Sequence, residues 1–133
     1  MIHSKIWRAA GAAVLLAGIA QVSLAQSPTP AERAIDYRKA VFKVVAGNFG
    51  PLAQNAQGKL ELPAGAANQY AQRLAAIADF PRDAFPEISR EGDTKAKPEI
   101  WTDKAGFEKL LNDFSTTAKA LAAVTAKADA KPD

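Results

Sequence analysis

The stretch AIDYRKAVFKVVAGNFGPLA, residues 34–53, decides the fold of this chain of 133 residues. Its large apolar residues recur seven, three, four and three positions apart, the spacing of one face of an amphipathic α-helix: Ile35, Phe42, Val45, Phe49 and Leu52. Charged residues lie between them. Pro51 removes one backbone hydrogen bond, so we expect a kink near residues 47–51 rather than the end of the helix.

The signals for a helix start lie just upstream of this stretch. Thr29 can cap a helix, Pro30 suits the first helical position, and Glu32 completes a capping box. The first helix is therefore expected over about residues 30–57.

Two more helices are predicted downstream, over about residues 63–80 and 102–128, from apolar residues at helical spacing. Between them, residues 81–101 form a long connection punctuated by proline and glycine, a length that is typical of a functional loop. No segment shows the alternation of a strand. The predicted fold class is all-α, of the antiparallel four-helix-bundle type, with only three helices present in this chain.

Residues 1–25 have the pattern of a signal peptide. Lys5 and Arg8 precede an uncharged apolar stretch, and Ser23-Leu24-Ala25 is a small-x-small cleavage site. We expect cleavage after Ala25, export, and no membrane association after cleavage. The remaining residues, 26–133, are expected to form one helical domain.

Composition excludes several classes of function. Loss of Lys5 and Arg8 lowers the net charge from +3 to +1, which gives no case for binding nucleic acid. The sequence has no cysteine, and His3 and Met1 are its only histidine and methionine. The exported chain would thus lack the usual ligands of zinc and haem iron and any histidine for acid–base catalysis. We do not expect an enzyme.

A family resemblance follows from these residues. Residues 34–53 resemble the first helix of cytochrome c′, the class II c-type cytochromes, in the pair Tyr37-Arg38 and in the run GNFGPL. TKAKPEIWTD, residues 94–103, resembles the segment ahead of that family's third helix, and residues 73–86 are similar in pattern. The resemblance implies a four-helix bundle around haem c. It also implies a periplasmic location, a homodimer through the first helix, and a redox partner or a small diatomic gas.

The chain departs from this family at its C-terminus. The haem-attachment motif Cys-x-x-Cys-His, expected on a fourth helix, is absent from the sequence, which ends at Asp133. The favoured interpretation is an incomplete cytochrome c′-like haem protein. A haem-free helical bundle that binds a protein partner through apolar helix faces is the alternative. Non-covalent haem binding through Tyr37 or Tyr70 is a third interpretation, since tyrosine can ligate haem iron.

The resemblance also implies which residues lie near a haem. It implies that the Arg38 guanidinium lies beside the propionates, with Lys39 as a polar neighbour. It implies that Phe42 lies on the distal face and that Val45 continues this wall. Thr94 and Lys95 are implied to lie in a loop at the haem edge. From spacing alone, Arg38 is interpreted as a solvated side chain and Phe42 as a core residue.

Overall fold

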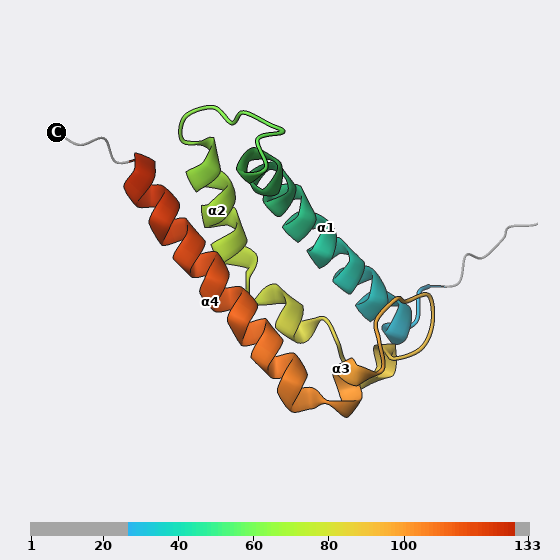
Figure 1. Ribbon diagram of the computed structural model, residues 1–133. Helices are drawn as coiled ribbons and strands as arrows, with labels where there is room; N and C mark the ends of the chain where they lie inside the picture. The colour runs from blue at the N-terminus through green and yellow to red at the C-terminus, as the bar shows by residue number, and fades with distance from the viewer. Residues whose placement is uncertain (1–26, 130–133) are drawn as a thin grey trace, which may run out of the picture.

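The computed structural model describes residues 27–129, which are helical apart from their connections (Figure 1). The predicted signal peptide, residues 1–25, lies outside the described residues. Three long helices and one single-turn helix form the fold, with two 3₁₀ turns between them: α1 (Pro30–Ala56), α2 (Ala66–Ile77), η1 (Phe80–Asp83), η2 (Glu87–Ser89), α3 (Glu99–Thr102) and α4 (Lys104–Asp129). The described residues contain no strand, so the all-α prediction is confirmed.

The start of α1 is fixed by the capping box. The Thr29 side chain accepts a hydrogen bond from the Glu32 backbone N–H at 3.2 Å, and the Glu32 carboxylate accepts one from the Thr29 N–H at 2.7 Å. Hydrogen bonding of the carboxylate by Thr29, chiefly by its backbone N–H, favours the ionised form and lowers the pKa of Glu32. The helix then continues through Pro51 to Ala56.

The connection between α2 and α4 contains more helix than its sequence indicates. Pro81 opens the 3₁₀ turn η1, and η2 and α3 follow before the long helix starts. Asp103 then ends α3, and its carboxylate accepts a hydrogen bond from the Gly106 N–H at 3.0 Å, which caps the first turn of α4. Single turns leave no helical periodicity, which is why the sequence did not reveal them.

The core lies where α2 packs against both α1 and α4 (Figure 1). Its buried residues are Leu74 of α2, Ala78 directly after α2 and Ala118 of α4, and Val45, Leu52 and Phe114 pack against them. Because two of the three buried side chains are alanines, the helix backbones can approach closely at this point. Within residues 27–129, no helix is both long and apolar enough to cross a membrane.

Candidate functional site: an apolar groove

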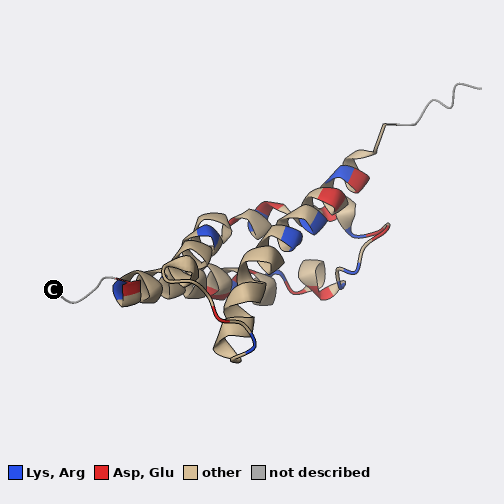
Figure 2. Cartoon of the chain, turned by 90° about the horizontal axis from the view of Figure 1, so that it is seen from above, with Lys and Arg blue, Asp and Glu red and all other residues tan. Residues whose placement is uncertain are grey.

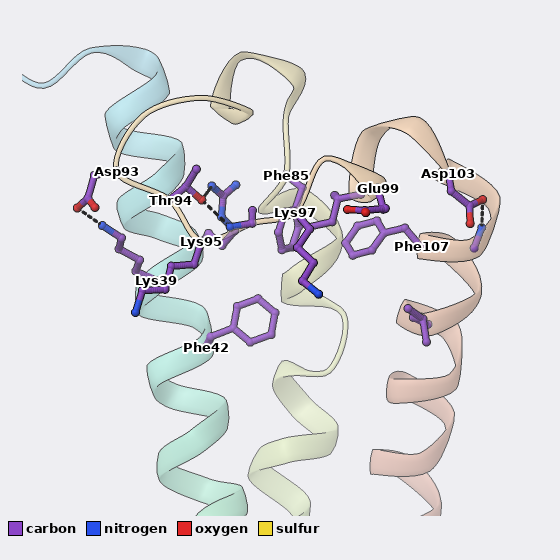
Figure 3. Close-up of a pocket in the computed structure, with 15 residues that line it drawn as sticks. Lys39, Phe42, Phe85, Asp93, Thr94, Lys95, Lys97, Glu99, Asp103 and Phe107 are labelled. Carbon is purple, nitrogen blue, oxygen red and sulfur yellow. Dashed lines mark hydrogen bonds and ion pairs between the residues drawn. The ribbon is translucent and has the colours of Figure 1, made fainter.

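A groove of about 840 Å³ opens at the end of the molecule where α3 lies (Figure 3). Its walls are α1 on one side and the start of α4 on the other, joined by α3 and by residues 90–98, which we call the strap. In Figure 1 the strap loops past the N-terminal turns of α1. The large apolar residues of the lining come from α1, the loop before η2, α3 and α4: Phe42, Phe85, Ile100, Phe107 and Leu110.

Aromatic rings meet edge to face at the back of the groove. The ring centroid of Phe85 lies 6.2 Å from that of Phe42 and 4.9 Å from that of Phe107. Trp101 packs behind them, 6.3 Å from Phe85, and its indole N–H donates to the Phe85 carbonyl at 3.1 Å. Trp101 is buried and does not line the groove. Edge-to-face rings of this kind form a rigid apolar wall.

Arg38 is buried beneath the strap, with 5% of its surface exposed. One terminal nitrogen donates to the Ala84 carbonyl at 3.1 Å and to Ser89 Oγ at 3.0 Å. The other donates to the Ser89 carbonyl at 3.2 Å and to Thr94 Oγ1 at 2.7 Å. The guanidinium also lies 4.8 Å from the Phe85 ring centroid, within cation–π range. Burial lowers the pKa of Arg38 from its ordinary value, but an arginine remains protonated.

The strap approaches α1 closely because Arg38 binds Thr94 of the strap and Ser89 just before it, and because of a glycine. Gly92 has φ of +118°, which side-chain-bearing residues rarely adopt. A Cβ at this position would lie 3.0 Å from Ile35 Cδ1 of α1. The Ser89 hydroxyl, which accepts from Arg38, donates to the Pro86 carbonyl at 2.7 Å. A hydrogen bond from the buried Arg38 guanidinium to Thr94 therefore holds the strap, and Gly92 allows the strap to lie close to α1.

Charged side chains surround the mouth of the groove. Lys39 Nζ lies 2.6 Å from an Asp93 carboxylate oxygen, and this hydrogen bond, with the charge of Lys39, lowers the pKa of Asp93. Among the described residues, Lys95 and Lys97 form no ion pair. Figure 3 shows Lys97 extending between Phe42 and Phe107. Both signs of charge occur along the strap (Figure 2).

Five of the six residues implied by the resemblance line this groove: Arg38, Lys39, Phe42, Thr94 and Lys95. Val45, expected to continue the wall beside Phe42, does not line it. It packs instead against the core cluster of Leu74, Ala78 and Ala118. Val45 lies nearly one helical turn beyond Phe42, at the level where α2 fills the space beside α1. The structure thus does not bring Val45 to the groove, and its place beside a haem stays a prediction.

The tyrosines lie elsewhere. Tyr37 lines a second, apolar cavity of about 210 Å³ with residues of α1, Ile77 and Phe80. The Arg73 guanidinium carbon lies over the Tyr70 ring, 5.6 Å from the centroid of that ring. Neither tyrosine lines the groove, so ligation of iron in the groove by tyrosine has no geometric support. Within residues 27–129, no group of three or more acidic, histidine or cysteine side chains is placed to hold a metal ion.

Sequence reasoning missed several lining residues. Phe85 and Lys97 lie in the long connection, whose length alone suggested function. Phe107 and Leu110 belong to the apolar stripe of the third predicted helix, where spacing could not separate a groove wall from a core. Leu110 is 66% exposed, which no pattern in the sequence indicates.

Comparisons with known proteins agree on one family. A family model described as cytochrome C′ matches residues 33–132. A cytochrome c′ from Rubrivivax gelatinosus is 34% identical over 89 residues, covering 66% of this chain and 69% of that protein. Another, from Halomonas halodenitrificans, is 35% identical over 96 residues, covering 68% of this chain and 73% of that protein.

Solved structures give the same result. Cytochrome c prime from Shewanella frigidimarina superposes with a TM-score of 0.70 at 33% identity, covering 80% of each chain. The crystal structure of cytochrome c′ from Rubrivivax gelatinosus gives 0.67 at 32% identity, covering 77% of this chain and 80% of that one. The chain belongs to the cytochrome c′ family. The resemblance seen in the sequence is confirmed, as is a fold of the four-helix-bundle type with three long helices among the described residues.

Membership of this family implies haem c, and the groove fits only part of that group. Its aromatic walls suit a flat macrocycle, and its lysines suit carboxylates. No lining residue is a histidine, cysteine or methionine, and the sequence has no cysteine for thioether attachment. The groove therefore has residues that suit a porphyrin ring and its carboxylates, but the sequence has no covalent attachment site.

Proposed function

We propose that residues 26–133 form the porphyrin-binding body of a periplasmic cytochrome c′-like protein that serves electron transfer, binding of small diatomic gases, or both, and that is not an enzyme. The observation that carries this proposal is the groove. It combines an aromatic back wall with two strap lysines that have no ion pair among the described residues. Family membership supports the haem, and the pattern of residues 1–25 supports export.

The size and chemistry of the groove support this function. Ligand sites are typically concave, mostly apolar and about 300–1,000 Å³, with a few polar groups that fix orientation. Here Phe42, Phe85 and Phe107 would contact the macrocycle and exclude water from one of its faces. Arg38, Lys39, Thr94 and Lys95 would lie at its edge. A bound haem would supply the iron, which can change oxidation state and bind a diatomic ligand.

We further propose that the chain is incomplete with respect to haem attachment. The motif that would form two thioether bonds and supply an axial histidine is not in this sequence. Leu110 is strongly exposed on the groove side of α4, as expected of a surface that another segment covers. Sequencing of the DNA beyond codon 133 tests this point, because a Cys-x-x-Cys-His within about 50 codons is expected.

A homodimer through α1 is also part of the proposal. Tyr37, Val44 and Phe80 are 43%, 51% and 49% exposed and form one apolar surface on the side of α1 that bears the second cavity. Val44→Lys should convert a dimer into a monomer in sedimentation experiments, whereas Val124→Lys, at a 65% exposed valine of α4, should not. A monomeric parent chain would contradict this part of the proposal.

Haemin titration tests porphyrin binding directly. Residues 26–133 should bind haemin with one saturable site, seen as a shift of its visible absorbance, and denaturing electrophoresis should leave no haem on the chain. Phe42→Ser should weaken binding about tenfold. Phe49→Ser is the matched control, because Phe49 is also an exposed phenylalanine of α1 but lines neither the groove nor the second cavity. Equal effects of the two substitutions, or no binding at all, would favour the haem-free module that binds a protein partner.

A further inference from the structure

We propose that the groove of this chain recognises a flat macrocycle and its two carboxylates but not the metal, and that the strap lysines Lys95 and Lys97 hold the carboxylates. This inference rests on the proposed porphyrin-binding function and narrows it. It also assigns the carboxylate contacts to the strap and not to Arg38, the residue that the family resemblance implied.

Arg38 has no terminal N–H left for a ligand. Its two terminal nitrogens carry four N–H groups and make four hydrogen bonds, to the Ala84 and Ser89 carbonyls and to the Ser89 and Thr94 hydroxyls. A carboxylate could reach these groups only by displacing Thr94 of the strap or the Ala84 and Ser89 oxygens from the guanidinium. Arg38 is therefore a positioning residue that holds the strap lysines over the groove.

Lys39 already has an anionic partner. Its ammonium lies 2.6 Å from the Asp93 carboxylate, so a second anion there would meet a charge already balanced. Lys95 and Lys97 line the same groove and form no ion pair among the described residues. Of the acids in the lining, Asp93 binds Lys39 and Asp103 caps α4, which leaves Glu99 alone at the exposed rim. These two cations without an ion pair among the described residues match the two carboxylates of a protoporphyrin.

The lining gives the metal no partner. Haem iron is ligated in proteins by histidine, cysteine, methionine or tyrosine, and none of these lines the groove. The free energy of binding must then come from burial of the ring against Phe42, Phe85 and Phe107 and from pairing of its carboxylates. Neither contribution depends on what occupies the centre of the ring.

The first experiment compares three ligands on residues 26–133 by quenching of Trp101 fluorescence, the only tryptophan left after signal cleavage. Trp101 contacts Phe85 at the back of the groove, so it reports on occupancy. Metal-free protoporphyrin IX and haemin should bind with dissociation constants within about threefold of each other. Protoporphyrin IX dimethyl ester should bind at least tenfold more weakly, because its carboxylates are masked.

The second experiment tests the two lysines. Lys95→Glu/Lys97→Glu should weaken binding of metal-free protoporphyrin at least tenfold and leave the dimethyl ester unaffected. Lys59→Glu/Lys127→Glu makes the same change of charge at exposed positions in the α1–α2 connection and near the end of α4. This control should bind like the parent chain. Far-ultraviolet circular dichroism checks that all variants remain helical.

Each of the following outcomes would overturn a stated part of the proposal. Haemin binding at least tenfold tighter than the metal-free ring would overturn metal independence and leave porphyrin binding intact. Equal loss in both lysine pairs, or equal binding of acid and ester, would overturn the assignment of Lys95 and Lys97. If neither ring binds, the proposed function fails and the inference fails with it.

Discussion

Two regions of the molecule differ in how closely its helices pack. Where α2 packs against α1 and α4, the core consists of Leu74, Ala78 and Ala118. At the strap end, Phe85, Phe107 and the buried guanidinium of Arg38 lie between α1 and α4. The first region closes because small side chains let the helices approach. The second stays open because rigid rings and a charge satisfied by loop carbonyls and hydroxyls occupy its back wall. The same helices thus form a closed, buried core at one level and an open groove at the other.

The largest expected effect is in the closed region. Leu74→Ala should lower the free energy of unfolding by about 3 kcal/mol, because it removes a side chain that is 98% buried between three helices and leaves a cavity. Urea unfolding followed by far-ultraviolet circular dichroism measures the change. Leu60→Ala, at a position 38% exposed, should cost less than about 1 kcal/mol. Similar losses at both positions would mean that the closed region is not a tightly packed core.

In the open region, Arg38→Met should cost about 2 kcal/mol, because four hydrogen bonds from a charged group are lost while buried Ser89 keeps only local partners. Its signature is local: amide hydrogen exchange of residues 89–96 should accelerate more than that of α2. Arg73→Met removes an exposed arginine and should change neither region's exchange. Uniform acceleration throughout the chain would contradict the role of Arg38 as the anchor of the strap.

A smaller effect is expected from the strap glycine. Gly92→Ala should cost about 1 kcal/mol, because φ of +118° strains an alanine and the new Cβ would meet Ile35 at 3.0 Å. Gly47→Ala is a control of opposite sign: it lies inside α1 with open space around it, so alanine should stabilise by about 0.5–1 kcal/mol. If Gly92→Ala also stabilises in thermal melts, the strap does not lie as close to α1 as described.

The smallest effect concerns the ion pair between Lys39 and Asp93. The pKa of Asp93 is lowered by its hydrogen bond to Lys39, so the folded state favours the ionised carboxylate. This stabilisation is present above the ordinary aspartate pKa of about 3.9 and is lost as the pH falls through the lower folded value. The stability difference between the parent chain and Asp93→Asn should therefore shrink below about pH 4, as urea midpoints would show. A difference that grows in acid would contradict this sign.

The parts of the fold that depend on neighbouring residues were predictable from sequence. The capping box at Thr29 and the stripe of Ile35, Phe42 and Phe49 are set within a few turns of one helix. The partners of Arg38 lie 46 to 56 residues away, so spacing left it as a solvated side chain although it is buried. Val45 packs against the core and not in the groove for the same reason: the position of α2 decides which space it faces.

The long-range bonds of Arg38 also bear on how the molecule folds. Contacts between distant residues form late, because closing a long loop costs entropy before any contact offsets it. Each helix relies on residues within a few turns, whereas the core and the strap both join distant residues: Val45 packs in the cluster of Ala118, and Arg38 binds Ser89 and Thr94, 51 and 56 positions away. The core and the groove are consequently expected to form after the helices. Refolding followed by Trp101 fluorescence should thus lag behind the return of helical dichroism.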